Sequence, residues 1–251
     1  MTLANPLRQL GRVAALVLLS LLALQLFFIA RIALMAVFDP QSTTFQRSEA
    51  WRLLREQGRI DWSQQWVPGE RIAANLKRAV IASEDAAFAE HSGVDWDAIE
   101  RAWERNQRAE ARAEQRNSST DSRRPRVEPK VVGGSTITQQ LAKNLFLSGE
   151  RTPLRKAQEF VLTFALEACL DKRRILEIYL NNVEWGEGVF GAQAAARHYF
   201  RIDAALLGAT PAARLAVMLP APKRFEKRPG SPYVAGRAAT VVARMGAVEL
   251  P

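Results

Sequence analysis

Two adjacent acidic residues end an otherwise apolar stretch, and they are candidates for moving a proton. Glu84 and Asp85 lie in IASEDAAFAEHSGVDWDAI, residues 81–99. On a helix, Glu84 would share an apolar face with Phe88. A carboxylate on such a face is either paired or has a raised pKa, which suits a general acid or base near neutrality. A capping or salt-bridged acid explains the segment equally well, and His91 alone is typical of a structural histidine.

A second polar constellation follows a pair of glycines in GGSTITQQLAKNLFL, residues 133–147. Its polar residues are Ser135, Thr136, Thr138, Gln139, Gln140, Lys143 and Asn144. Thr136 and Gln139 have the spacing of a capping box, which predicts a helix start. A helix N-terminus beside Lys143 favours an anion, although the phosphate-binding loop pattern is absent. A capped structural helix explains Thr136, but not why Gln139, Gln140, Lys143 and Asn144 come together.

A third segment, ERTPLRKAQEF, adds cations and one more carboxylate. Thr152 and Pro153 predict a helix start, and Arg155 and Glu159 are four residues apart, as in an ordinary surface pair. With Lys143 from the previous segment, the sequence offers four cations within a short span. The other three are Arg151, Arg155 and Lys156. Arginine binds phosphate oxygens in pairs and lysine neutralises them, so the cluster suits a pyrophosphate.

The composition narrows the class of protein. The chain has 251 residues, a formal charge of +9 and 48% hydrophobic residues, which is typical of a folded protein. Nucleic acid, anionic lipid or an anionic substrate could explain the charge. We find no DNA- or RNA-binding signature and expect no nucleic acid partner. The single cysteine, Cys169, excludes an internal disulfide framework and is predicted to be a buried structural thiol.

The N-terminus contains an apolar segment long enough to approach a membrane span. Val13–Ala30 carries no charge over 18 residues, and after Arg31 the apolar run continues to Phe38. Arg31 could reach the far interface. A cleaved signal peptide is the alternative, but its apolar region would be shorter and end at small residues. We therefore predict an uncleaved anchor over 13–38, after a cytoplasmic tail over 1–12 that contains Arg8 and Arg12.

The remaining patterns predict an all-α protein. Helix patterns run over 71–90, 154–171, 173–182, 191–199 and 204–219, and a small hairpin is expected at 183–189. The expected organisation is a juxtamembrane connector over 39–68, a catalytic domain over 69–235 and a C-terminal tail over 236–251. Residues 97–116 begin as a helix, but 104–130 contain eight basic and five acidic residues and predict a mobile charged loop.

Five segments in this order resemble the peptidoglycan glycosyltransferases, and among them the monofunctional biosynthetic transglycosylases. The matching segments are EDAAFAEHSGVD, GGSTITQQLAKN, RKAQE, ILEIYLNNVEWGEGVFGAQAAARHYF and RLAVMLPAPKRF. The resemblance covers about Trp66 to Tyr233. Residues 105–130 depart from it, because this stretch is longer and more charged than the family pattern.

The resemblance implies a lysozyme-like helical fold that acts on lipid II at the outer, periplasmic face of the bacterial inner membrane. Glu84 matches the general base that deprotonates the 4-hydroxyl of the acceptor sugar. That oxygen would attack the anomeric carbon of the donor with inversion, and undecaprenyl pyrophosphate would leave. Glu159 matches a second carboxylate that assists at the donor, directly or through a divalent cation, Mg²⁺ or Mn²⁺. No tightly bound cofactor is expected.

The resemblance also implies a set of substrate-binding residues and partners. The expected substrate-binding residues are Asp85, Phe88, His91, Ser135, Thr136, Gln139, Gln140, Lys143, Asn144, Arg151, Arg155 and Lys156. Of these, Lys143, Arg151, Arg155 and Lys156 match pyrophosphate-contacting positions. The expected partners are lipid II, the growing glycan chain, the inner membrane and proteins of cell-wall synthesis or division.

Two other functions remain to be separated from this one. A lysozyme-like hydrolase or lytic transglycosylase shares the fold but leaves the cations from Lys143 to Lys156 unexplained. A non-enzymatic membrane scaffold leaves Glu84 and the glutamines unexplained. A pyrophosphate leaving group needs cations rather than a proton, whereas a glycosidase needs an acid for its leaving oxygen. One carboxylate with a basic cluster therefore favours the transferase.

Overall fold

The computed structural model describes residues 6–118, 128–129, 133–150 and 152–251, and in these residues helices dominate, as the sequence predicts. The helices are α1 (Pro6–Leu34), α2 (Thr44–Gln57), α3 (Ala74–Glu84), α4 (Trp96–Ser118), α5 (Ile137–Phe146), α6 (Pro153–Cys169), α7 (Lys172–Asn182), α8 (Ala192–Phe200), α9 (Ala209–Met218), α10 (Pro222–Phe225) and α11 (Pro232–Met245). Two 3-10 turns, η1 (Gly69–Arg71) and η2 (Ala204–Leu206), and three strands, β1 (Ser63–Gln64), β2 (Glu184–Gly186) and β3 (Val189–Phe190), complete the elements.

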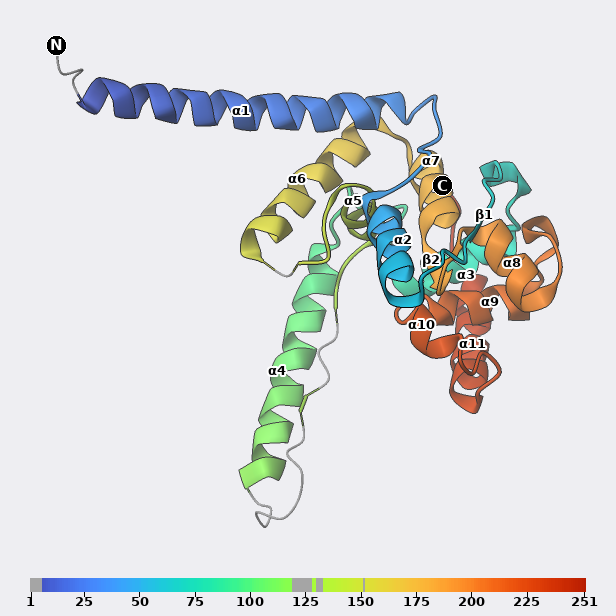
Figure 1. Cartoon of the computed structure of the whole chain (residues 1–251). Helices are drawn as coiled ribbons and strands as arrows, with labels where there is room; N and C mark the ends of the chain where they lie inside the picture. The colour runs from blue at the N-terminus through green and yellow to red at the C-terminus, as the bar shows by residue number, and fades with distance from the viewer. Residues whose placement is uncertain (1–5, 119–127, 130–132, 151) are drawn as a thin grey trace.

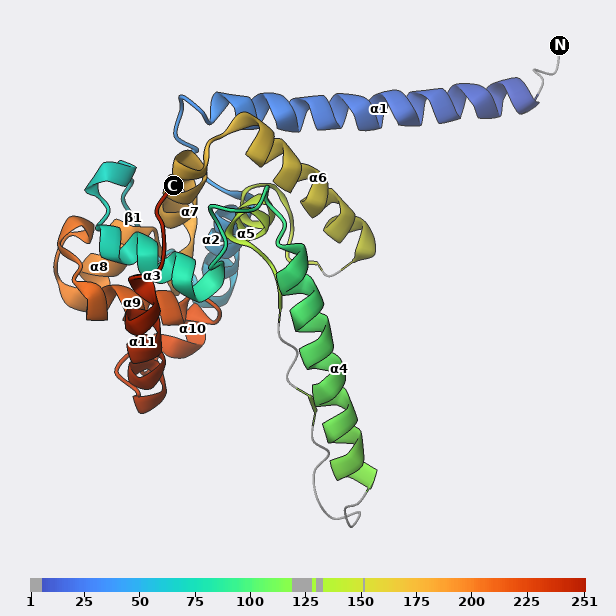
Figure 2. The same cartoon turned by 180° about the vertical axis from the view of Figure 1, so that it is seen from behind.

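The body of the protein is a helical cluster from which α1 and α4 project in different directions (Figure 1). Helices α3, α5, α7 and α9 contribute many of its buried side chains, such as Leu76, Leu141, Ile178 and Leu215. Helix α6 lies between α1 and the base of α4, as the view from behind also shows (Figure 2). Cys169 at the end of α6, predicted to be a buried structural thiol, packs against this core and is partly buried.

The small hairpin expected at 183–189 is present and is part of a three-stranded sheet. Strand β2 pairs antiparallel with β3, and β1 adds to the other side of β3 in parallel. Gly188 in the hairpin has a φ of +70°, and a Cβ there would lie 2.0 Å from the carbonyl oxygen of Asp61. Glycine is therefore required where the hairpin meets the chain that leads into β1.

The helix starts follow the capping residues that the sequence shows. Thr136 accepts a hydrogen bond from the Gln139 amide, and the Gln139 side chain accepts one from the Thr136 amide, which completes the predicted capping box of α5. Thr152 caps α6, whose first residue is Pro153. Both predicted helix starts are confirmed. They could be predicted because the capping residues lie within four residues of each other in the chain.

Residues 104–118, expected as the first half of a mobile loop, are helical. They form the outer turns of α4, which extends from Trp96 to Ser118. Alanine, arginine, glutamate and glutamine favour helix, and oppositely charged residues four apart stabilise it, as Arg108 and Glu104 do at 3.0 Å. The composition of the segment does not show that its opposite charges are spaced four residues apart. In the rest of the expected loop, residues 119–127 and 130 lie outside the described residues.

Two segments expected as connector and tail belong to the folded body. The connector over 39–68 contains α2, which buries Leu53 and packs on α5. The tail over 236–251 contains most of α11, which buries Ala238, Val241 and Met245 against α9 and α3. The apolar residues of both segments are spaced for contact with other helices of the body, which composition does not show.

The expected anchor is a single helix whose last turn is part of the core. The one helix in the described residues that is long and apolar enough to cross a membrane spans Leu7–Leu34, and large apolar side chains along most of its length are exposed. At its end, Ile32 and Met35 are buried in the main core. The Arg31 guanidinium lies 5.2 Å from the ring centre of Phe146 in α5 rather than extending away.

Polar contacts also tie the anchor to the body. Gln25 on α1 and Gln158 on α6 exchange two amide hydrogen bonds of 3.0 Å. Arg174 on α7 donates to the Met35 carbonyl at 2.8 Å and to the Asp39 carboxylate at 2.7 Å. Since an amide inside an apolar span is costly unless it is paired, the Gln25–Gln158 pair helps to fix α6 beside the helix.

We expect truncation of the anchor's core residues to destabilise the catalytic domain itself. Ile32→Ala should lower the free energy of unfolding by about 2–5 kcal/mol, because it leaves a cavity in the main core. Leu18→Ala, on the exposed surface of the same helix, is the matched control and should change it little. Thermal unfolding in detergent micelles measures both. Equal midpoints for the two variants would show that the last turn of α1 is not part of the core.

Candidate active site

The candidate base stands at the end of a helix. Helix α3 ends at Glu84, because Asp85 leaves the helical conformation with φ −162° and ψ 73°. The sequence predicted a helix as far as residue 90, and this prediction is wrong. Residues 85–93 instead form turns that end at Gly93, whose φ of +88° favours glycine. Glu84 is thereby held where the helix opens rather than along its side.

Asp85 causes the break by bonding elsewhere. One carboxylate oxygen accepts the backbone N–H of Ile137 at 2.9 Å, and the other lies 2.8 Å from Nε2 of His91. The amide of Gly93 donates to Nδ1 of His91 at 3.1 Å, so the neutral ring carries its proton on Nε2 and donates it to Asp85. Asp85 and His91 therefore join the turn after α3 to the start of α5.

Several residues expected to bind substrate make packing contacts or hydrogen bonds within the fold. Phe88 is 0% exposed, Asp85, Thr136 and Gln139 are also buried, and both ring nitrogens of His91 are occupied within the protein. Thr136 also donates to the Gly93 carbonyl at 2.6 Å. These contacts give Asp85, Phe88, His91 and Thr136 a part in holding the turn after α3 against α5, and their direct contact with substrate stays a prediction. The sequence does not distinguish a structural role from substrate contact, because polar side chains such as those of Asp85, His91 and Thr136 serve both.

Glu84 is held by a chain of hydrogen bonds from two other helices. Nε2 of Gln140 on α5 donates to Oε2 of Glu84 at 3.0 Å, and the hydroxyl of Tyr179 on α7 lies 2.9 Å from Oε1 of Gln140. Burial raises the pKa of Glu84 above its ordinary value, hydrogen bonds from Gln140 and Ser83 lower it, and the Asp85 charge raises it. This is the environment of a proton acceptor near neutrality. The sequence placed Tyr179 in the core and missed its contact with the site.

A groove of about 300 Å³ gathers most of the other predicted residues. The residues that line it lie on α2, α5 and α6, in the segment just before α5, and between α5 and α6. The lining comprises Phe45, Ser135, Gln139, Gln140, Lys143, Asn144, Leu147, Ser148, Gly149, Glu150, Arg155, Lys156 and Glu159. Gln140 lines the groove and also bonds Glu84, so it connects the groove to the candidate base. Arg151, another predicted residue, lies outside the described residues.

Glu159 lies at the base of the cationic side of this groove. Its carboxylate is 4% exposed, accepts from Arg155 at 2.8 Å and also forms an ion pair with Lys156. A buried carboxylate between two cations keeps them ordered and offsets part of their mutual repulsion. Arg155 and Lys156 are thus held around one carboxylate, and the three side chains together keep a positive net charge.

Two buried donors at the groove have no hydrogen-bond partner among the described residues. They are Nε2 of Gln139 and Nε of Arg155. An unpaired buried donor is costly, and an oxygen-rich ligand in the groove would satisfy it. The pattern of unused donors and paired cations fits an anion better than a neutral group.

The surroundings of Glu159 do not fit a resident divalent ion. Both of its oxygens are bound by cationic side chains. Among the described residues, no group of three or more His, Cys, Asp or Glu could hold a metal ion. The divalent cation expected at this carboxylate stays a prediction.

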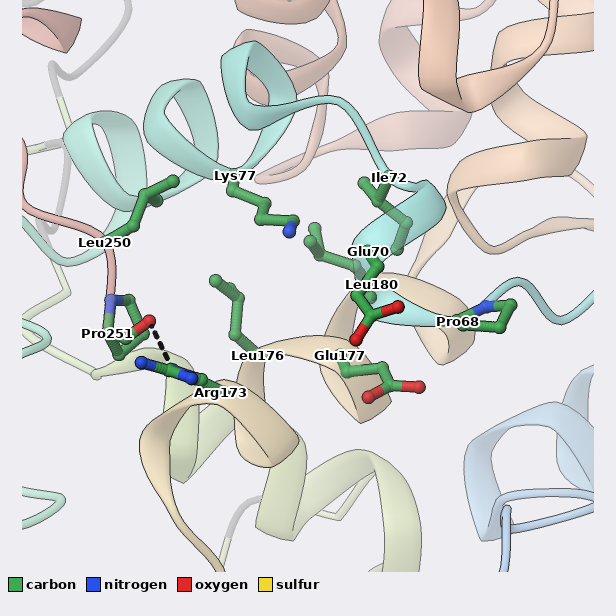
Figure 3. A pocket seen from close by; sticks show the side chains of 11 residues that line it. Pro68, Glu70, Ile72, Lys77, Arg173, Leu176, Glu177, Leu180, Leu250 and Pro251 are labelled. Carbon is green, nitrogen blue, oxygen red and sulfur yellow. Dashed lines mark hydrogen bonds between the residues drawn. The ribbon is translucent and has the colours of Figure 1, made fainter.

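A larger cavity lies away from these residues, on another face of α7. It has a volume of about 420 Å³, and none of the predicted site residues lines it. Lys77 extends into it from α3, while Glu70 and Glu177 lie at its edge (Figure 3). Two cations, Lys77 and Arg173, are matched by two carboxylates in this cavity, whereas three cations face two carboxylates in the groove at α5 and α6, so only the groove is net positive.

A further acidic cluster links α2, β2 and α10. Glu49 and Glu184 are both buried and share Lys223, whose ammonium is 3.5 Å from Glu184. Burial raises the pKa of Glu184 to about 7, Lys223 lowers it, and the Glu49 charge raises it. The sequence did not single out these residues, which meet only through tertiary contacts.

The raised pKa of Glu184 predicts stability that falls with rising pH. The folded protein binds a proton here more tightly than the unfolded chain, so stability should fall between about pH 4.5 and pH 7 by up to about 3 kcal/mol. Glu184→Gln should remove this slope and raise the unfolding midpoint at pH 8. Glu110→Gln, at an exposed position on α4, is the control. A slope unchanged by Glu184→Gln would disprove the assignment.

The fold and site define a class of protein. A helical domain docked on an apolar N-terminal helix holds a partly buried carboxylate beside a cationic groove. A carboxylate can deprotonate a hydroxyl, and the cations can stabilise a departing anion. These are the groups needed to transfer a sugar from an anionic, membrane-borne donor.

Comparison with known proteins agrees with this class. The transglycosylase family model matches residues 52–246. A biosynthetic peptidoglycan transglycosylase of Burkholderia pseudomallei (strain K96243) is 55% identical over 230 residues, which cover 92% of this chain and 83% of the relative. Those of Burkholderia thailandensis and Burkholderia orbicola (strain MC0-3) are each 54% identical, over 92% of this chain and 83% and 86% of the relatives. The chain belongs to the transglycosylase family and is a glycosyltransferase of peptidoglycan synthesis.

Proposed function

We propose that this glycosyltransferase extends glycan strands from lipid II, with inversion at the anomeric carbon and release of undecaprenyl pyrophosphate. The observation that carries the proposal is the pairing of Glu84 with a cationic groove through one shared residue, Gln140. A proton acceptor and an anion-binding surface are thus joined side by side. A hydrolase of finished glycan would need a proton donor for its leaving oxygen instead.

Glu84 acts as the general base. Its carboxylate takes the proton of the acceptor's 4-hydroxyl as that oxygen forms a bond to the donor's anomeric carbon. Burial raises the pKa of Glu84 and so makes its carboxylate more basic than an exposed one, and the Gln140 hydrogen bond orients it. Attack from the side opposite the leaving group inverts the anomeric centre.

The groove cations stabilise the leaving group. As the bond from the anomeric carbon to oxygen breaks, negative charge grows on the pyrophosphate, which needs no proton to leave. Lys143, Arg155 and Lys156 line the groove and supply positive charge there, and Glu159 orders the last two. Fixed cations act more strongly in such a site than in bulk water.

The docked anchor supports a substrate taken directly from a membrane. Gln158, which bonds Gln25 on α1, immediately precedes Glu159 in the groove. The phosphate-binding side therefore lies beside the apolar helix, where the head group of a lipid-linked sugar would arrive. With Arg8 and Arg12 before the span, we propose an inner-membrane enzyme whose catalytic domain is periplasmic.

Labelled lipid II tests the proposal. The purified full chain in detergent should convert it into long glycan strands that are resolved on a gel. Release of fragments from intact cell wall without strand formation would instead show a hydrolase. Inertness in both assays, with a folded protein by circular dichroism, would favour a scaffold.

A further inference from the structure

Tyr179 is a buried residue whose hydroxyl faces the site through a single intermediary. The side chain is 1% exposed on α7, between core residues Ile178 and Leu180. Its hydroxyl is 2.9 Å from Oε1 of Gln140, and Nε2 of Gln140 is 3.0 Å from Oε2 of Glu84. Three helices thus meet in one chain of hydrogen bonds that ends on the proposed base.

The chemistry of the three groups determines which of them donates and which accepts in each hydrogen bond. An ionised carboxylate only accepts hydrogen bonds, so the amide of Gln140 must present its NH₂ group to Glu84. Its carbonyl oxygen then faces Tyr179, which must donate. Burial and the charges of Glu84 and Asp85 raise the pKa of Tyr179 well above its ordinary value, so the phenol stays a donor.

Without the Tyr179 hydroxyl, the Gln140 side-chain amide could stabilise the protonated form of Glu84 instead of its ionised form. If Gln140 turned over, its carbonyl oxygen would face Glu84, and that oxygen can bond only a protonated carboxyl group. The Tyr179 hydroxyl opposes this rotation by satisfying the carbonyl oxygen on the far side. Leaving that buried oxygen without a donor is unfavourable.

We propose that Tyr179 is a positioning residue that, through Gln140, keeps Glu84 ionised and oriented as the base. The inference rests on the proposed role of Glu84 and adds to it a residue of the core. The other groups that act on Glu84 are Ser83, whose hydroxyl is 3.5 Å from Oε1, and the adjacent Asp85. Asp85 is already bonded to His91 and Ile137, so it does not orient the base.

Tyr179→Phe tests the proposal, because it removes one oxygen and keeps the ring. The acid limb of the pH profile of kcat/KM for lipid II polymerisation should move to higher pH by about one unit. The rate below that limb should fall about tenfold and recover at higher pH. A purely structural role would lower the rate by one factor at every pH, and that result would overturn the proposal.

Two further variants sharpen the test. Tyr199→Phe is the matched control, because its partly buried hydroxyl bonds the Trp185 carbonyl at 2.8 Å instead; its acid limb should stay in place. In a Gln140→Leu background the limb should already be shifted, and adding Tyr179→Phe should shift it no further. An additional shift would show that Tyr179 does not act through Gln140.

A direct titration separates this inference from the proposed function. Carbon-13 resonances of labelled glutamate, assigned with Glu84→Gln, should show a higher pKa for Glu84 in Tyr179→Phe than in the wild type, without any substrate. If Glu84→Gln polymerises normally, the base assignment fails. If it is inactive while both the titration and the rate profile of Tyr179→Phe match the wild type, the base stands and the role of Tyr179 is refuted.

Discussion

Glu84→Gln is expected to reduce glycan-strand formation by about 10²- to 10⁴-fold, the usual contribution of a general base. The substitution keeps the size of the side chain and removes the group that accepts the proton. Binding of lipid II should survive, since the groove cations lie on α5 and α6. The measurement is initial polymerisation rate on labelled lipid II, with binding followed separately by fluorescence of a labelled analogue.

The control for Glu84→Gln is a nearby acid outside the hydrogen-bonded chain. Glu90 is exposed in the turns after α3, and Glu90→Gln should leave the rate unchanged. If Glu84→Gln polymerised at nearly the wild-type rate, the base would have to be another group. If it lost binding as well as rate, Glu84 would serve the binding of substrate rather than proton transfer.

Features that depend on neighbours in sequence could be predicted. The start of α5 follows from Thr136 and Gln139, and the start of α6 from Thr152 and Pro153. The end of α3 could not be predicted, because its cause is a hydrogen bond from Ile137, 52 residues away from Asp85. A carboxylate that leaves its helix to bond another one follows no local pattern.

Composition misled where spacing mattered. The outer half of α4 has the charge content of a loop, yet it is helical, with Glu104 and Arg108 paired along its surface. Most of α11 falls in the segment expected as a tail, 236–251, and its apolar residues are buried only through packing against α9 and α3. In both cases, helix propensity and tertiary burial decide the structure, and net charge does not.

The site could be predicted best from polar residues that helix capping and the core do not require. Gln140, Lys143 and Asn144 exceed what capping requires, and all three line the groove. Asp85 and Thr136 looked equally functional, but the fold uses them for its own hydrogen bonds. Tyr179 showed no signal, because an aromatic residue with apolar neighbours on a helix is typical of a core. Only its three-dimensional neighbours show what its hydroxyl does.

Lys143→Ala is expected to lower kcat/KM for polymerisation by about 10- to 100-fold without unfolding the protein. Lys143 is exposed on α5 and lines the groove, where loss of one cation weakens the hold on the donor's phosphates. The effect should weaken at high salt, because exposed charges are screened. Steady-state rates at several lipid II concentrations measure the loss, and circular dichroism follows the helix content.

Lys227→Ala separates a local cation from the overall charge. Lys227 is exposed beyond the end of α10, outside the groove, so its removal lowers the net charge equally and should leave kcat/KM unchanged. A similar loss in both variants would point to general attraction of an anionic substrate rather than to a binding site. Loss of helicity in Lys143→Ala alone would instead assign this residue to the stability of α5. The specific pattern, a rate loss confined to Lys143→Ala with the helix intact, requires contact between this groove and the anionic donor.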